Sequence, residues 1–117
     1  MKTDGILGRG FSRFPCQTWA MITEHALLPV LPGREEDFEA AFREARPLIA
    51  SAPGFQELSL SRSIESRNTY LLLVRWNALE DHTEGFRQSE SYAVWRTLLH
   101  HFYSPFPVVE HFETIKL

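Results

Sequence analysis

The stretch TYLLLVRW, residues 69–76, decides the fold class of this chain. Successive side chains of a β-strand point to opposite faces of its sheet, so this stretch would present apolar residues on both faces. One face would carry Tyr70, Leu72, Val74 and Trp76, and the other Leu71 and Leu73. A small domain has helices enough to cover one face of a sheet, so the second face needs another cover. We therefore predict a homodimer that forms through packing of two sheets.

A strand and a helix are expected before this stretch. The apolar run at 22–30, ITEHALLPV, ends in a turn that contains proline and glycine, which is typical of a strand. Acidic residues at 35–37 suit a helix N-terminus, and apolar residues recur at helical spacing over 38–49. Because Pro47 has no amide hydrogen, we expect a kink or a restart there, with this proline opening a last short turn.

A second strand and two helical segments flank the central stretch. Residues 55–64 alternate apolar and polar side chains, which predicts a half-buried strand. Asn77 and Glu80 form a capping-box-like start for a helix over 78–88, and Ser89 suits the cap of a second helical segment. Counting about 100° per residue, that second segment carries one apolar stripe that should face the core. The stripe consists of Tyr92, Trp95, Leu98, Leu99 and Phe102.

Residues 106–115 alternate once more and complete the set with a last strand. The resulting order, βαββαβ, is that of the ferredoxin-like arrangement. The chain is therefore predicted to be an α+β protein, with a four-stranded antiparallel sheet and both helical segments on one face.

Composition bounds the function. The chain has 117 residues, enough for one domain, and its 44% hydrophobic and 23% charged residues are typical of a globular protein. No apolar run approaches the roughly 20 residues that cross a bilayer, so we expect no membrane partner. Fifteen acidic residues outnumber twelve scattered basic ones, which argues against nucleic acid. Cys16 is the single cysteine and cannot form an internal disulfide, which fits a reducing, cytoplasmic setting.

The chain divides into an arm at 1–21 and a domain at 22–117. The arm lacks the continuous apolar core of a signal peptide, and its glycines favour a flexible segment. Met21 stands directly before the first strand, so translation from Met21, with the arm as an extension, is an alternative.

The stretch HHFYSPFPVVEH at 100–111 raises the question of a metal or catalytic site. His100 and His101 end the second helical segment and point about 100° apart, while His111 and Glu113 offer only two ligands on one strand face. We therefore predict a joint between helix and strand with surface or interface histidines, and no metal. The chain has no GxSxG turn, so we expect no nucleophilic serine. It also has no GxGxxG or GxxxxGK motif, so we expect no nucleotide cofactor.

Several short motifs occur together in one order. They are PGxEExFExAF at 32–42, APGF at 52–55, YLLLVRW at 70–76, EDH at 80–82 and FRQS at 86–89. In order and spacing, residues 22–115 resemble the antibiotic biosynthesis monooxygenase (ABM) domain. The resemblance implies a dimeric α+β barrel, in which two sheets pack face to face and each subunit keeps a pocket between its sheet and its helices.

Some members of this family are similar to cofactor-independent oxygenases that oxidise electron-rich phenols with O₂. Such chemistry needs an apolar pocket, a base and a cation that stabilises negative charge. The resemblance assigns Trp76 to the pocket wall, Arg96 to the anion partner and His82 to the base. It implies a cofactor-independent monooxygenase that acts on a quinol or polycyclic phenol. A structural alternative stands beside each match: Trp76 as core filler, and Arg96 and His82 as solvated helix residues.

The remaining pocket candidates come from the same resemblance. His25, Leu72, Phe86 and Tyr92 are the expected substrate-binding residues, with Leu72 and Phe86 standing where relatives carry an asparagine and a histidine. His25 is also a second candidate for the base. Haem-degrading members use an asparagine, a tryptophan and an axial histidine, and these positions hold Ala26, Phe86 and Arg96 here. Haem degradation is therefore disfavoured, and a non-catalytic dimeric module that binds a small apolar metabolite remains the main alternative.

Overall fold

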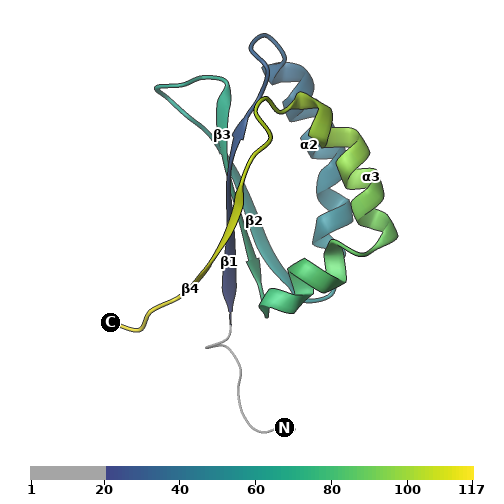
Figure 1. The fold of residues 1–117 in the computed structure, drawn as a ribbon, viewed down its shortest axis with the longest axis vertical. Helices are drawn as coiled ribbons and strands as arrows, with labels where there is room; N and C mark the ends of the chain where they lie inside the picture. The colour runs from purple at the N-terminus through teal and green to yellow at the C-terminus, as the bar shows by residue number, and fades with distance from the viewer. Residues whose placement is uncertain (1–20) are drawn as a thin grey trace, which may run out of the picture.

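The computed structural model describes residues 21–117, so apart from Met21 the predicted arm lies outside the described residues. The elements are β1 (Ile22–Pro29), α2 (Glu35–Ala50), β2 (Phe55–Arg62), β3 (Thr69–Trp76), α3 (Glu90–Leu99) and β4 (Val109–Glu113). A π-helical turn, η2 (Asp81–Phe86), precedes α3, and a 3₁₀ turn, η3 (His100–Phe102), follows it. The four strands form one antiparallel sheet in the order β2-β3-β1-β4. This confirms the predicted ferredoxin-like α+β fold (Figure 1).

The core lies between one sheet face and the two long helices. Along β3 the side chains alternate between buried and half-buried, with Tyr70 and Trp76 at the two ends of the buried row. The buried face of α2 contributes Phe38, Phe42, Ala45 and Ile49, and that of α3 contributes Trp95 and Leu99. The apolar stripe predicted for the second helical segment therefore does face the core.

No helix among residues 21–117 covers the other sheet face, as the edge-on view in Figure 1 shows. Leu27 of β1 pairs with Leu71 of β3 on this face, and the Leu27 side chain is 53% exposed. Phe112 of β4 is also exposed there and packs its ring edge against His25. Both faces of the central strand are thus apolar, as its sequence predicts.

The helix α2 runs through Pro47 without interruption, so the expected restart is absent. Pro47 lies only three residues before the end of α2 and removes a single hydrogen bond from the last turn. That turn is held from beyond the helix, because the backbone N–H and the side-chain hydroxyl of Ser51 both donate to the Pro47 carbonyl.

The helix predicted over 78–88 is present but shorter, because the backbone is helical only over residues 79–86, and most of this segment is the π-helical turn η2. Asn77 does not cap it: the Asn77 side-chain oxygen accepts instead from Gln56 Nε2 at 2.6 Å. The N–H of Ala78 donates to the Asp81 carboxylate at 3.1 Å, which begins the turn from a different residue.

The second helical segment starts as predicted, because the Ser89 hydroxyl accepts from the Tyr92 N–H at 3.2 Å. The last strand is shorter than the predicted 106–115 and comprises only Val109–Glu113. Within residues 21–117, no helix combines the length and the apolar character that a membrane crossing requires.

Candidate active site

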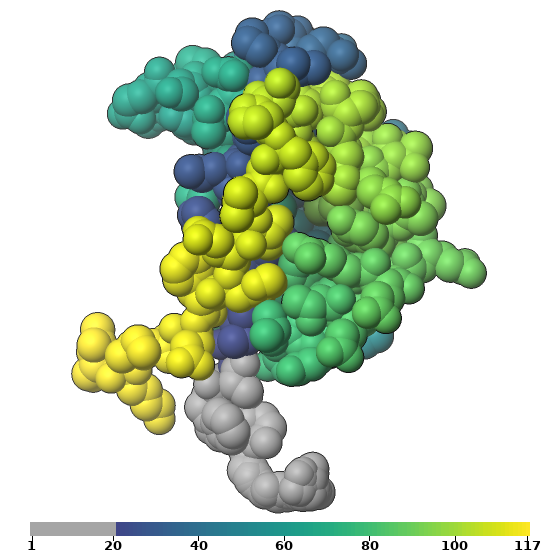
Figure 2. Space-filling model, viewed as in Figure 1, coloured from purple at the N-terminus to yellow at the C-terminus, as the bar shows by residue number. Residues whose placement is uncertain are grey.

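A cavity of about 240 Å³ lies between the sheet and the helical layer. In Figure 2 it appears as a hollow between the C-terminal segment, in yellow, and the green helical region. Its walls are mainly aromatic and aliphatic, with a few polar groups. The lining residues are Glu24, Ala26, Leu28, Ile49, Leu72, His82, Phe86, Arg87, Tyr92, Trp95, His100, Tyr103, Phe106, Pro107 and Val109.

The most unusual of these residues is Glu24, an acid buried in a strand. Alternation along β1 turns Glu24, Ala26 and Leu28 toward the helices, and Glu24 is only 5% exposed. Its Oε1 accepts a hydrogen bond from the Trp76 indole N–H at 3.0 Å. A buried carboxyl that is paired with fixed donors is a typical feature of a functional site.

His82 completes a cluster with Glu24. The turn η2 turns this side chain inward, where it is 3% exposed and stacks on the Trp76 ring at 5.4 Å between centroids. His82 Nε2 lies 3.4 Å from Glu24 Oε1, and Nδ1 lies 2.8 Å from His111 Nε2 on β4. When Glu24 is ionised, the consistent tautomer has His82 Nε2–H facing the carboxylate and Nδ1 accepting from His111. A fixed imidazole thus holds the carboxylate in place.

Burial sets the protonation of this cluster. It raises the pKa of Glu24 above its ordinary value, although the Trp76 hydrogen bond and the positive charge of Arg87 act in the other direction. It lowers the pKa of His82 to about 3, with smaller contributions from Arg87 and His111. His82 is therefore neutral at neutral pH, and Glu24 is the group whose proton affinity has moved toward neutrality.

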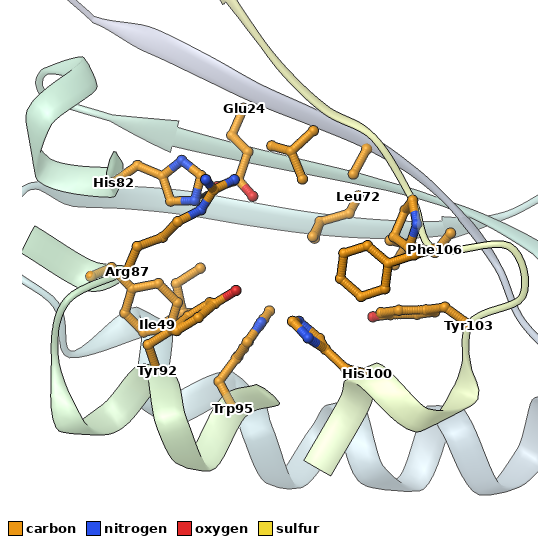
Figure 3. A pocket seen from close by; sticks show the side chains of 15 residues that line it. Glu24, Ile49, Leu72, His82, Arg87, Tyr92, Trp95, His100, Tyr103 and Phe106 are labelled. Carbon is orange, nitrogen blue, oxygen red and sulfur yellow. Dashed lines mark ion pairs between the residues drawn. The ribbon is translucent and has the colours of Figure 1, made fainter. Parts of the chain in front are cut away.

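A cation lies at the same end of the cavity. Arg87 follows η2 directly, and its backbone N–H donates to the His82 carbonyl at 3.0 Å. In Figure 3 its side chain extends toward Glu24 and His82. Its charge influences the pKa of Glu24, His82, His100 and His111, which places a cation beside the acid and the imidazoles.

The structure brings most of the sequence-predicted residues to this cavity. His82, Leu72, Phe86 and Tyr92 line it, and Trp76 lies directly behind, in contact with Glu24 and His82. Arg96 does not line it: this side chain is exposed on the outside of α3, 5.9 Å from the Tyr92 ring. His25 does not line it either, because strand alternation places His25 on the opposite sheet face.

The sequence-based prediction of the site misses five lining residues that carry polar atoms: Glu24, Arg87, Trp95, His100 and Tyr103. Alternation with the apolar Ala26 and Leu28 is the signal that would have pointed to Glu24. If α-helical spacing is continued to His100, this side chain lies outside the apolar stripe of α3. The backbone changes to the 3₁₀ turn η3 at this residue, and His100 lines the cavity instead. Among residues 21–117 no three potential ligands are grouped as a metal site would require.

The fold and this cavity define a class of small α+β proteins, in which the helix-covered face of a four-stranded antiparallel sheet encloses a mainly aromatic pocket. A family model described as antibiotic biosynthesis monooxygenase (ABM) matches residues 21–98. The chain belongs to this family, as its motifs predict.

Individual relatives agree with this assignment. An uncharacterized protein of Bacillus subtilis, YczJ, is 52% identical over 95 residues, which make up 81% of this chain and 100% of that protein. A solved structure of a putative antibiotic biosynthesis monooxygenase from Bordetella bronchiseptica is 40% identical. It superposes with a TM-score of 0.78 over 83% of this chain and 99% of that one. SnoaB, a cofactor-independent oxygenase from Streptomyces nogalater, shares the fold at 20% identity, with a TM-score of 0.68 over 84% of this chain and 96% of SnoaB.

Proposed function

We propose that this protein is a cofactor-independent monooxygenase that oxidises a quinol or a related phenol with O₂ in the cavity between sheet and helices. The observation that carries the proposal is the buried Glu24 carboxyl, hydrogen-bonded by Trp76 and in contact with the neutral His82. The family membership and the description of SnoaB as a cofactor-independent oxygenase support the same class of reaction.

Glu24 is the proposed general base. A base is most effective when its pKa approaches the working pH, and burial moves the Glu24 pKa in that direction. His82 is assigned to positioning, because a histidine with a pKa of about 3 is a poor proton acceptor near neutrality. Arg87 takes the part first expected of Arg96, as the cation beside the developing phenolate.

The reaction balances without a cofactor. Glu24 takes the proton of a ring hydroxyl, and the phenolate passes one electron to O₂, leaving an aryloxyl radical and superoxide. Their combination at a ring carbon forms a carbon–oxygen bond, the protonated Glu24 returns its proton to the peroxide, and loss of water from the resulting hydroperoxide leaves a carbonyl. For a hydroquinone the sum is hydroquinone plus O₂ to hydroxyquinone plus water: one oxygen atom enters the ring, and the other leaves with two substrate hydrogens.

The test is Glu24→Gln, which keeps an oxygen to accept from Trp76 but removes the base. We expect kcat for O₂ uptake with naphthohydroquinone, above the uncatalysed rate, to fall about 100-fold or more, since general bases typically contribute that much. KM should change by less than about threefold. An unchanged kcat would refute Glu24 as the base.

The assay also separates the proposal from its alternative. Purified metal-free protein is tested against anthrones, naphthohydroquinones and simple quinols, with flavin and haem added separately. Uptake without additives supports the oxygenase. Binding of these compounds without uptake under any condition would instead support a non-catalytic module for small apolar metabolites.

We also propose that a second copy of the chain covers the outer sheet face. The exposed Leu27 and Phe112 and the half-buried Leu71 and Leu73 form one apolar surface there. Two such surfaces facing each other would remove these side chains from water, and the symmetric contact would be the same on both copies.

A further inference from the structure

The cavity has a second polar end, away from Glu24. Tyr92 and Trp95 of α3, His100 of η3 and Tyr103 of the following loop all line it. In Figure 3 the phenol oxygens of Tyr92 and Tyr103 and the ring nitrogens of Trp95 and His100 point toward the middle of the cavity. The Glu24 carboxyl faces the same space from the sheet side.

No hydrogen bond joins the polar side-chain atoms of these four residues to another group in residues 21–117, and none of these atoms is fully buried. Polar groups in protein interiors are normally paired, and Trp95 is only 6% exposed. Their hydrogen-bonding capacity is therefore open toward whatever occupies the cavity. By contrast, Trp76 is already hydrogen-bonded to Glu24, and His82 to His111.

The chemistry of this end favours a neutral oxygen as its partner. Burial lowers the pKa of His100 and raises the pKa of Tyr103, so both groups are uncharged near neutral pH. A phenol and an indole N–H donate, and a neutral imidazole both donates and accepts. Such groups match a hydroxyl or carbonyl oxygen, whereas the side chain of the cation Arg87 extends toward Glu24 and His82 (Figure 3).

The site is held in place by ring contacts. The His100 ring packs at 4.9 Å from Phe106 and at 6.0 Å from both Tyr92 and Tyr103. Tyr92 in turn packs edge-on against Phe86 at 5.5 Å. Side chains fixed in this way lose little freedom when a ligand binds, which favours discrimination between similar ligands.

Size narrows the ligand further. Apolar protein cavities of about 150 Å³ hold a benzene molecule. The 240 Å³ of this cavity therefore suits one ring or two fused rings, and a larger ring system would have to extend through the mouth.

We infer that the substrate is an arene of one or two rings that carries oxygen at both ends, with one hydroxyl at Glu24 and the second oxygen at the subsite of Tyr92, Trp95, His100 and Tyr103. The first of these contacts rests on the proposed function; the second rests on the unpaired groups alone. A ligand without the second oxygen leaves these donors unpaired, for which we expect about 10- to 100-fold weaker binding.

The test is anaerobic calorimetric titration of the full chain with 1,4-naphthohydroquinone and with 1-naphthol, which lacks the second oxygen. The hydroquinone should bind about 10- to 100-fold more tightly. Tyr103→Phe and His100→Phe each remove one of the four polar groups, and in the double variant this ratio should fall by at least about threefold, with Tyr92 and Trp95 left to contribute the remainder. Tyr70→Phe is the matched control, since its hydroxyl binds Glu39 at 2.6 Å outside this cavity, and it should keep the full ratio.

Equal affinities of the unaltered protein for the two ligands would overturn the inference, as would a ratio that survives the double substitution. Because no O₂ is present, the result does not depend on catalysis. A retained ratio in Glu24→Gln, together with absent O₂ uptake in the unaltered protein, would reject the proposed reaction while supporting the subsite.

Discussion

Glu24 and His82 form a pair in which burial pushes both partners toward the uncharged form. The carboxyl gains affinity for a proton and the imidazole loses it, so each departs from its ordinary pKa in the opposite direction to the other. Titratable groups whose environments separate their pKa values in this way are the usual basis for assigning acid and base roles. Here the separation favours the carboxyl as the proton acceptor and leaves the histidine as its support.

The lowered pKa of His82 makes stability depend on pH. In the unfolded chain His82 takes up a proton below about pH 6.5, whereas in the folded protein it does so only near pH 3. Within this window the unfolded state binds more protons, so the free energy of unfolding falls as the pH is lowered, by at most about 1.4 kcal/mol per pH unit from this group. Glu24 acts oppositely, because its pKa is raised in the folded protein. Above the pKa of the unfolded carboxyl the folded state binds more protons, so the contribution of Glu24 to the free energy of unfolding falls as the pH rises.

The variant His82→Gln should remove this contribution. Urea unfolding at several pH values between 7 and 4 should show a shallower loss of stability in the variant than in the unaltered protein. His100, whose pKa is also lowered, makes no hydrogen bond to His82 and remains in both proteins, so its contribution cancels in the comparison. His111 is hydrogen-bonded to His82, so the difference between the slopes reports on this pair together. Identical slopes would show that His82 is protonated as easily in the folded protein as in the unfolded chain.

Sequence alone locates part of this site. His82 is identified by its spacing from Trp76 in a family pattern, and the structure does place the two rings in contact. Glu24 is missed because a single acid in an apolar strand looks like an exposed residue until its face is known. Arg87 lies directly after η2 and lines the cavity, whereas Arg96 lies on the exposed side of α3. Spacing rules do not anticipate the π-helical geometry of η2, so they do not single out Arg87.

At the scale of elements, the position of η2 depends on a glycine two strands away. Gly54, in the turn before β2, has a φ of +86°, and the Asp81 side chain occupies the place that a Cβ at Gly54 would take. The Asp81 carboxylate accepts from the Ala78 N–H, and the Asn77 N–H donates to the Gly54 carbonyl at 2.8 Å. Because His82 follows Asp81 directly, this close approach helps to turn His82 inward. The APGF motif thus has a structural explanation that its sequence alone does not reveal.

Replacing Gly54 by alanine should therefore cost more than backbone strain. Gly33→Ala is a matched control, since Gly33 has a similar φ of +90° but open space around its Cβ position. We expect Gly33→Ala to lower the free energy of unfolding by about 1–2 kcal/mol. Gly54→Ala should lose at least about 1 kcal/mol more, because Asp81 must move.

Urea denaturation of both variants measures the difference, and near-ultraviolet circular dichroism reports whether the Trp76 environment changes. Equal losses in the two variants would mean that the Asp81 contact is easily displaced and does not position η2.

At the scale of the molecule, one apolar face of the sheet has no helix over it in the described part of the chain, and the alternation of one strand predicts this apolar face. That reading succeeds because the side-chain period of a strand is two, so a single apolar stretch specifies both faces. The cavity is harder to foresee, since it is formed by segments far apart in sequence: β1, the turn η2, α3 and the loop after η3. Local patterns predict elements well, whereas the depth of a pocket depends on how all of them pack.

The uncovered face leads to the last prediction, which concerns assembly. The unaltered protein should run at twice its 13.6 kDa chain mass in light scattering coupled to size-exclusion chromatography. Leu27→Glu should shift it toward the monomer, because two-fold symmetry places the new charge in the interface twice. Because about half of each Leu27 is left to bury on dimerisation, the two lost contacts together contribute about 2 kcal/mol, so the dissociation constant should rise at least about 30-fold. Leu27 is already 53% exposed in the single chain, so the monomer itself should keep its fold.

Val94→Glu provides the control: Val94 is 49% exposed on α3, away from the sheet, and its replacement should leave the dimer intact. Dissociation by both changes would indicate a general effect of charge, and a dimer that tolerates Leu27→Glu would place the interface elsewhere.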